Sequence, residues 1–208
     1  VIINTDSSIT YTPDGNFTGT DSFTYTVDDG SGAANATDTA TVTISYSECS
    51  ETIWLEDFND LANGTTVDNG ETAWSIDTSG LNTGYMEVRD QRFLAHGSDI
   101  DSEFGMGVWI SEVIDITSHT DVVLSVDIEG TGSLDDGQDY LRIYYKLDGG
   151  AEMLFIDGDK DGDFDSTTVL SPTLNGNSVQ IVIRSGSTGD SEYYFYDNIT
   201  ATGTCHAD

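Results

Sequence analysis

The basic side chains are the scarcest chemical groups in this sequence and the first candidates for ligand binding. Six Lys and Arg stand against 38 Asp and Glu, which gives a formal net charge of −32 at pH 7. In so acidic a chain, a guanidinium group either pairs with a neighbouring carboxylate or holds an anionic ligand. All six basic residues lie in one part of the chain: Arg89, Arg92, Arg142, Lys146, Lys160 and Arg184.

Residues 140–147 alternate two kinds of side chain. An extended strand places residues two apart on one face, so Tyr140, Arg142, Tyr144 and Lys146 share the face opposite the apolar residues. This order favours tyrosine rings that stack on sugars, alternating with cations that hold acidic substituents. Residues 179–184 alternate in the same way, so Arg184 and Arg142 converge if the two strands share a sheet.

Three further residues are candidates for the same surface. Arg89 and Arg92 flank a turn and are expected at its rim, and Trp109 follows a glycine-rich stretch with room for a ligand or for close sheet packing. The competing interpretation is that each arginine pairs with its own acid, as with Arg89 and Asp90, and that exposed tyrosines are ordinary on strands. The candidate ligand-binding residues are Arg89, Arg92, Trp109, Tyr140, Arg142, Tyr144 and Arg184.

Residues 157–165 match the D-x-D-x-D-G opening of a calcium-binding loop. Alternating carboxylates supply the oxygen ligands that calcium prefers, and the glycine permits a sharp bend. A complete EF-hand loop needs Glu at its twelfth position, where this chain has Thr168. The segment is therefore either a calcium loop or a solvated hairpin tip, and its carboxylates are Asp157, Asp159, Asp161, Asp163 and Asp165.

Catalytic motifs are few. The three histidines are scattered, and neither G-x-S-x-G nor H-E-x-x-H occurs. A pair of acids for glycoside hydrolysis arises by chance among 38 carboxylates, but no pair is singled out. We expect a domain that is not an enzyme.

Charge and cysteine content indicate the setting. A pI of about 4.1 argues against nucleic acid and anionic membranes, because both require a basic protein face. Cys49 and Cys205 are predicted to form a disulfide in an oxidising, secreted or cell-surface environment, the alternative being two buried thiols. The first residues lack the pattern of a signal peptide, so we expect a monomeric fragment of a longer, multidomain chain.

The elements that position these groups are predicted to be strands. Short alternating segments separated by glycine-rich turns indicate an all-β, antiparallel sandwich. The strongest segments are residues 22–27, 121–128, 139–147, 179–184 and 192–197. Most other aromatic residues are expected in its core: Trp54, Phe58, Trp74, Phe93, Phe155 and Phe195.

A domain boundary is predicted near residues 46–50. Before it, the sequence YTPDGNFTGTDSFTYTVDDG at 11–30 resembles the closing half of the cadherin-like, Ig-like repeats of bacterial surface proteins. The resemblance covers residues 1–46, so it implies a partial Ig-like spacer that lacks its opening strands. In that family the acidic turns can bind calcium, which makes Asp21, Asp28 and Asp29 weak candidates.

Residues from about 53 to 203, within a domain predicted at 49–205, resemble the jelly-roll modules, related to MAM and carbohydrate-binding domains, of secreted proteins from marine Bacteroidetes. The matching segments are LEDF at 55–58, WISEVIDI at 109–116, DYLRIYY at 139–145 with LDGG at 147–150, and YFYDNI at 194–199. The resemblance implies a jelly-roll β-sandwich. It also implies a structural calcium ion between Glu56 or Asp57 and Asp197.

The sequence therefore predicts a non-catalytic carbohydrate-binding module that attaches a secreted glycoside hydrolase or lyase to its substrate. The predicted ligand is an anionic, sulfated algal polysaccharide such as a fucan or carrageenan. The alternative is a structural or adhesive stalk domain stiffened by calcium, without a sugar ligand. Retention in gels of sulfated and desulfated polymer separates the two hypotheses.

Overall fold

A computed structural model describes all residues except 7, 14–18, 35, 47–49, 82, 99–105, 136, 159–161, 190 and 206–208. The chain divides into two compact units, Val1–Cys49 and Ser50–Asp208. Each unit is built from β-strands, so the predicted all-β class is confirmed. Among the described residues, no helix is long and apolar enough to span a membrane.

The described residues of the first unit form four strands in two small sheets. Strands β1 (Ile2–Ile3) and β2 (Ile9–Thr10) pair with each other, and β3 (Gly19–Asp28) pairs with β4 (Thr37–Tyr46). Phe23 lies opposite Val42 in the longer hairpin, and the ring of Tyr11 stacks on Phe23 at 6.3 Å between centroids. The opposite face is built from threonine and serine pairs such as Thr24 and Thr41.

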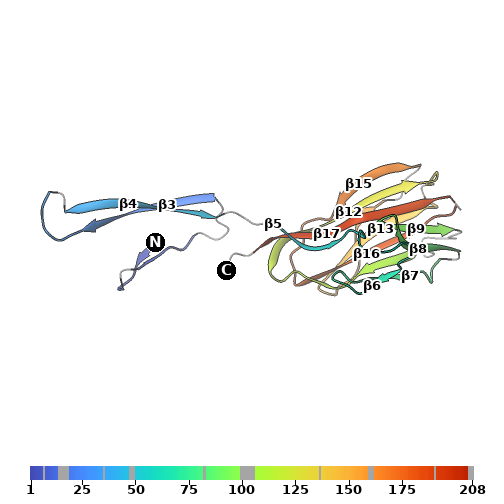
Figure 1. The fold of residues 1–208 in the computed structure, drawn as a ribbon, viewed down its shortest axis with the longest axis horizontal. Helices are drawn as coiled ribbons and strands as arrows, with labels where there is room; N and C mark the ends of the chain where they lie inside the picture. The colour runs from blue at the N-terminus through green and yellow to red at the C-terminus, as the bar shows by residue number, and fades with distance from the viewer. Residues whose placement is uncertain are drawn as a thin grey trace. The chain divides into compact units, whose positions relative to one another are not determined.

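The second unit contains two sheets of antiparallel strands that lie face to face (Figure 1). The first, called the β13–β16 sheet, has the order β14-β13-β16-β10-β7-β6, and β11 also pairs with β16. Its strands are β6 (Val67–Asp68), β7 (Trp74–Asp77), β10 (Gly107–Ser111), β11 (Ile114–Asp115), β13 (Tyr140–Leu147), β14 (Met153–Asp157) and β16 (Ser178–Gly186).

The second sheet, called the β12–β17 sheet, has the order β15-β12-β17-β9-β8, and β5 pairs with the later part of β17. Its strands are β5 (Ser50–Glu56), β8 (Thr83–Arg89), β9 (Arg92–Ser98), β12 (His119–Thr131), β15 (Phe164–Leu170) and β17 (Tyr193–Cys205). All five strongest predicted segments are strands in the structure, one of them in the first unit. The predicted sandwich is confirmed.

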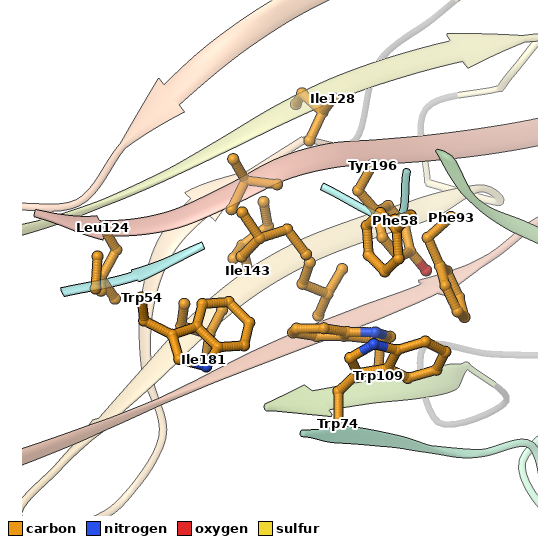
Figure 2. Close-up of a cluster of buried hydrophobic side chains, with 14 of the residues drawn as sticks. Trp54, Phe58, Trp74, Phe93, Trp109, Leu124, Ile128, Ile143, Ile181 and Tyr196 are labelled. Atoms are coloured by element: carbon orange, nitrogen blue, oxygen red, sulfur yellow. The ribbon is translucent and has the colours of Figure 1, made fainter. Parts of the chain in front are cut away.

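The core lies between these two sheets and is rich in aromatic rings (Figure 2). Phe58 contacts both Trp74 and Phe93, with ring centroids 5.8 Å and 5.6 Å away. The other buried members alternate along their strands with residues on the outer faces, as a two-sided sheet requires. Burial of these side chains is the main source of stability and fixes which side chains remain on the outer faces.

Candidate functional site

The outer face of the β13–β16 sheet brings the two predicted arginines together. Arg142 lies directly opposite Arg184 on the neighbouring strand, as expected if the two strands share a sheet. Asp157 follows Arg142 on β14, and Asp77 lies two strands beyond Arg184, with Val108 between them. Opposite residues in a sheet share a face, so these five form one cross-strand line, called the charged row.

A line of mainly apolar side chains runs beside the charged row. Tyr144 lies opposite Val182 on one side and Leu154 on the other, and Val182 lies opposite Ile110. Ser75 completes this line, called the apolar row, on β7. Leu154 is 47% exposed, whereas Val182 is fully buried although it lies on the outer face. The long side chains around Val182 therefore form a continuous surface over the sheet.

Both arginines of the charged row have acidic partners and tyrosine neighbours. Arg184 makes two hydrogen bonds to Glu152, at 3.1 Å and 2.9 Å, and the Nε of Arg142 lies 3.9 Å from Asp157. The guanidinium carbons lie 5.1 Å from the Tyr140 ring centroid for Arg142 and 6.0 Å from the Tyr144 ring centroid for Arg184. Cation–π contact and ion pairing thus hold both groups in place on this face.

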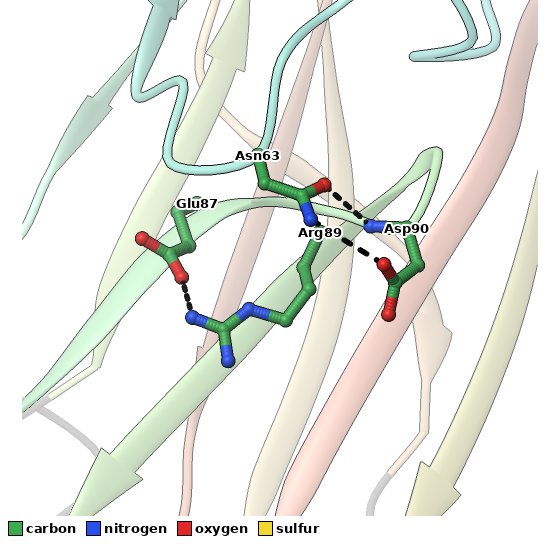
Figure 3. A network of polar contacts seen from close by, with 4 residues as sticks. All are labelled: Asn63, Glu87, Arg89 and Asp90. Atoms are coloured by element: carbon green, nitrogen blue, oxygen red, sulfur yellow. Dashed lines mark hydrogen bonds and ion pairs between the residues drawn. The ribbon is translucent and has the colours of Figure 1, made fainter.

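Arg89 and Arg92 lie in the other sheet, so the four arginines do not form one cluster. Arg89 ends β8, Arg92 begins β9, and the two lie opposite each other beside the hairpin turn. Arg89 pairs with Glu87 (Figure 3), and Arg92 pairs with Glu129 at 2.7 Å. Each of the four arginines therefore has an acidic partner, as the competing interpretation expects; for Arg89 and Arg92 the acids are Glu87 and Glu129, and the predicted Asp90 is not among them.

Two aromatic residues lie elsewhere than predicted. Phe195 is not in the core: it is partly exposed on the outer face of the β12–β17 sheet, and the Arg92 guanidinium carbon lies 4.1 Å from its ring centroid. Tyr194 and Tyr196 occupy the core in its place. Trp109 was a candidate for ligand contact, but it is fully buried. It packs against Trp54, Phe58 and Trp74, so close sheet packing is the correct interpretation.

The described part of the predicted calcium loop serves several separate contacts. Asp159 and Asp161 lie outside the described residues. Asp157 faces Arg142, whereas Asp163 accepts hydrogen bonds from the backbone N–H groups of Gly132 and Ser133 at 2.8 Å and 2.7 Å. These hydrogen bonds lower the pKa of Asp163, Ser133 contributing most. A calcium ion in this loop stays a prediction.

The second predicted calcium site pairs Glu56 or Asp57 with Asp197, and of these residues Glu56 is engaged in other contacts. The buried carboxylate of Glu56 accepts hydrogen bonds from Phe58, Thr72 and Trp74 at 2.8–2.9 Å, through both oxygens. Its pKa is raised because burial disfavours the charged form. Glu56 therefore holds the Trp74 indole in place through a hydrogen bond. Both carboxylate oxygens of Glu56 already accept hydrogen bonds from protein donors.

Asp197 has two acidic neighbours. Asp127 lies opposite it on the β12–β17 sheet, and Asp57, which follows β5, also acts on its charge. Burial is the largest cause of the raised pKa of Asp197, and repulsion from Asp127 and Asp57 adds to it. Asp127 accepts hydrogen bonds from the Thr168 hydroxyl and the Asn198 amide through its two oxygens, so, like Glu56, it is already held by protein donors.

Two buried acids join the ends of the two sheets. Asp139, just before β13, is fully buried and accepts hydrogen bonds from the backbone N–H groups of Thr188 and Asp135 at 2.7 Å and 2.5 Å. Glu192, just before β17, is 7% exposed, and its pKa is raised by burial and by the neighbouring Asp139. Because both carboxyl groups are buried, this pair serves a structural role.

Among the described residues, one group of three possible metal ligands has its ligand atoms close together. Glu51, His119 and Cys205 have ligand atoms within 4.8 Å of one another. Cys205 is also the described half of the predicted disulfide, and Cys49 lies outside the described residues. The disulfide therefore stays a prediction.

Comparison with known proteins finds a match for the first unit. Residues 1–45 match the family model described as a bacterial Ig domain. This agrees with the resemblance of residues 1–46 to an Ig-like repeat. No protein of curated function matches the chain.

Solved structures similar to this chain include an adhesin and carbohydrate-binding modules. The K3 adhesin domain of Lys-gingipain from Porphyromonas gingivalis has a TM-score of 0.46 and 11% identity, with coverage of 74% of this chain and 99% of that domain. A carbohydrate-binding module of family 29 has a TM-score of 0.44 and 8% identity, with coverage of 76% and 90%. The xylan-binding CBM22-1 domain of Xyn10C from Paenibacillus barcinonensis has a TM-score of 0.37 and 11% identity, with coverage of 78% and 100%. Likeness at this level carries no functional argument.

Proposed function

We propose that the second unit is a non-catalytic carbohydrate-binding module whose polysaccharide ligand lies across the outer face of the β13–β16 sheet. The observation that carries the proposal is the adjacency of the charged row and the apolar row on one exposed sheet face. Sugars have apolar C–H faces and polar hydroxyl edges, so a ligand lying along the two rows satisfies both kinds of surface.

The apolar row provides the stacking surface. Tyr144 offers a large, rigid ring with a polar tip, and Leu154 extends the apolar contact toward the sheet edge. In the charged row, guanidinium groups donate hydrogen bonds and carboxylates accept them. A hydroxyl group does both, so it can bridge Arg142 and Asp157 without separating their charges.

The dimensions of the face favour a chain over a single sugar. Each row crosses five strands, which lie ~4.8 Å apart, so its length is roughly 19 Å. Both rows run across the strands on an open face. A polysaccharide therefore binds through an internal stretch of several units, with its ends outside the site.

The charge of the ligand is a narrower proposal. Adjacent Arg142 and Arg184 support a sulfated polymer such as a fucan or carrageenan, because guanidinium binds sulfate through paired hydrogen bonds. Such a ligand must replace Glu152 at Arg184, and Asp77 and Asp157 oppose it. A neutral polysaccharide is not repelled by these carboxylates. We therefore propose a neutral polysaccharide as the first candidate ligand and a sulfated polymer as the second.

Affinity electrophoresis tests the proposal. The full chain is run through gels that contain neutral polysaccharides or the sulfated and desulfated forms of one polymer. We expect retention in at least one gel and roughly tenfold or more weaker retention for Arg184→Ala, because a charge-assisted hydrogen bond is lost. Arg92→Ala is the matched control in the other sheet. Unretarded migration in every gel, or equal retention of Arg184→Ala, contradicts the proposal.

Selective retention by the sulfated form supports the narrower anionic proposal. Retention by neutral or desulfated polymer assigns the face to uncharged sugars. Product release from any of these polymers would instead indicate an enzyme.

A structural stalk is the second candidate function, favoured by the bacterial Ig match of residues 1–45. In this alternative both units are spacers and calcium provides stiffness. We propose that Asp57 and Asp197, with backbone carbonyl oxygens, hold a structural calcium ion as the jelly-roll resemblance implies, because carboxylates and carbonyls supply the oxygen ligands it prefers. When bound, the ion would neutralise the mutual repulsion of the two carboxylates.

Chelation tests the calcium proposal. We expect EDTA to lower the melting temperature of the wild-type chain, and Asp57→Asn to remove the difference between calcium and EDTA. An unchanged melting curve in EDTA rejects the metal. No retention in any gel together with a calcium-dependent melting temperature supports the stalk.

Either function fits an extracellular or cell-surface setting. For the carbohydrate-binding module, we propose attachment to a glycoside hydrolase or lyase elsewhere in the protein. The low pI opposes association with nucleic acid or anionic membranes. Size-exclusion chromatography with light scattering tests the expected monomeric state.

A further inference from the structure

We propose that the tip of the β8–β9 hairpin forms a second, separate binding site for the terminal unit of a neutral saccharide. A cavity of about 430 Å³ lies at this tip. This volume is in the lower part of the range for small-molecule sites, which suits one or two sugar units better than a polymer. The residues that line it are Asn63, Gly64, Glu87, Arg89 and Asp90.

The lining combines hydrogen-bond donors and acceptors at close quarters (Figure 3). The Arg89 guanidinium pairs with Glu87 and remains 46% exposed, so part of its donor fork faces solvent. Its central carbon lies 5.4 Å from the Tyr85 ring centroid, and Tyr85 shares the strand face of Glu87 and Arg89. Donors beside carboxylate acceptors match the hydroxyl groups of a sugar, each of which both donates and accepts.

The hairpin turn that carries this lining is held in an unusual backbone conformation. Asp90 and Gln91 have positive φ values of 53° and 62°, a conformation that normally favours Asn-Gly or Gly. The Asn63 side chain holds the turn: its Oδ1 accepts from the Asp90 backbone N–H at 2.8 Å, and its Nδ2 donates to the Asp90 carboxylate at 3.4 Å. The site is therefore organised before any ligand binds.

The backbone beside the cavity requires glycine at one position. Gly64 has φ of +89°, whereas a Cβ added there would make only an ordinary contact, 3.8 Å from the Glu87 Oε2 atom. Its backbone N–H donates to the Val88 carbonyl at 2.8 Å, which fixes the loop against β8. A larger residue would be strained by the backbone and would project toward the Glu87 carboxylate.

Charge selects the class of ligand. Glu87 and Asp90 outnumber Arg89, so an anionic ligand is repelled, within a chain of formal charge −32. The same net negative charge attracts a divalent cation, but the Glu87 carboxylate is already paired with the Arg89 guanidinium. A neutral polyhydroxy compound is not repelled, leaves this ion pair in place, and uses both the acceptors and the donor fork.

Nuclear magnetic resonance titration of the full chain tests the site. The probes are D-glucose, D-galactose, D-mannose and L-fucose, each added separately, and the signals are the backbone amides of Asn63, Gly64 and Asp90. We expect at least one sugar to shift these signals. Arg89→Ala should weaken that binding roughly tenfold or more, because its donor fork is lost.

Glu87→Gln is the second variant, because it keeps the shape of the side chain and removes the charge that positions Arg89. It should also weaken sugar binding, with an unchanged melting curve confirming that the chain is folded. Arg184→Ala is the matched control on the other sheet, and its sugar response should equal that of the wild type.

Three results overturn the second site: no shift with any of the four sugars, equal binding by wild type and Arg89→Ala, or shifts of these amides with calcium chloride alone. The test is independent of the polysaccharide proposal. Loss of gel retention in Arg184→Ala with intact sugar response in the same variant separates the two sites. Gel retention should be unchanged in Arg89→Ala.

Discussion

The two outer faces of the sandwich carry arginines, acids and aromatic rings, but these residues make different contacts on each face. On the β13–β16 sheet, Arg142 and Arg184 lie side by side, with acids at the ends of their row and an apolar row beside them. On the β12–β17 sheet, Arg92 lies over the Phe195 ring and pairs with Glu129, so it covers an aromatic residue. In an acidic chain every one of these arginines has an acidic partner. The ion pairs alone therefore do not distinguish the two faces. The difference lies in the side chains beside each ion pair, which are an apolar row on one face and a covered aromatic ring on the other.

The largest expected effect separates the faces by binding. Tyr144→Ala should weaken gel retention roughly thirtyfold, about 2 kcal/mol, because a partly exposed aromatic anchor is removed from the apolar row. Phe195→Ala should leave retention unchanged. Affinity electrophoresis of both variants measures this difference, and equal losses would show that the two faces do not differ as argued.

The next effect separates the faces by stability. Arg92→Ala should lower the free energy of unfolding by about 1–2 kcal/mol, because it removes a cation–π contact together with an ion pair over Phe195. Arg184→Ala should cost less than about 1 kcal/mol, because the two ion pairs are similarly exposed but the Arg184 guanidinium carbon lies 6.0 Å from its aromatic ring centroid, against 4.1 Å for Arg92. Urea unfolding of both variants measures the two losses of stability. A larger loss for Arg184→Ala than for Arg92→Ala would contradict the prediction.

A smaller effect concerns the acids that join the two sheets. The pKa of Glu192 is raised by burial and by Asp139, so its protonated form favours the folded state. Its contribution to stability is complete below the pKa of the unfolded chain and is lost as the pH rises through the folded pKa. Glu192→Gln should therefore raise the melting temperature by a few degrees at pH 7, and this gain should vanish near pH 4. Melting curves across this range measure it; a gain that is equal at all pH values contradicts the titration.

The smallest effect concerns the turn of the β8–β9 hairpin. Gln91→Gly should stabilise the chain by about 0.5 kcal/mol, because glycine adopts a positive φ without the steric cost of a side chain, and its greater unfolded entropy offsets part of the gain. Thermal unfolding of Gln91→Gly and the wild type shows whether the substitution raises or lowers stability. Sugar binding at the cavity should be unchanged, since Gln91 does not line it.

The sequence predicted the local structure of the β13–β16 face well. The period of two placed Tyr140, Arg142 and Tyr144 on one side of β13, and the burial of Leu141 and Ile143 on the other side agrees with that assignment. It did not predict Glu152 and Asp157 as the partners of the arginines. Those contacts depend on strand register and on a loop, and local alternation contains neither.

The errors have a common physical cause. Phe195 and Trp109 both lie on strands with strong alternation, but alternation does not say which of two faces points to the core. In the segment 193–196, either pair of aromatic residues could have been buried. The structure buries Tyr194 and Tyr196, which leaves Phe195 on the outer face beneath Arg92.

By itself, the sequence determined the all-β class, the strand positions and the scarcity of positive charge, because these follow from local periodicity and composition. The tertiary structure alone decided that Arg142 and Arg184 adjoin while Arg89 and Arg92 lie in the other sheet. The reason is that strand order and register are set by long-range pairing and core packing. Residues far apart in the chain become neighbours only once those contacts form.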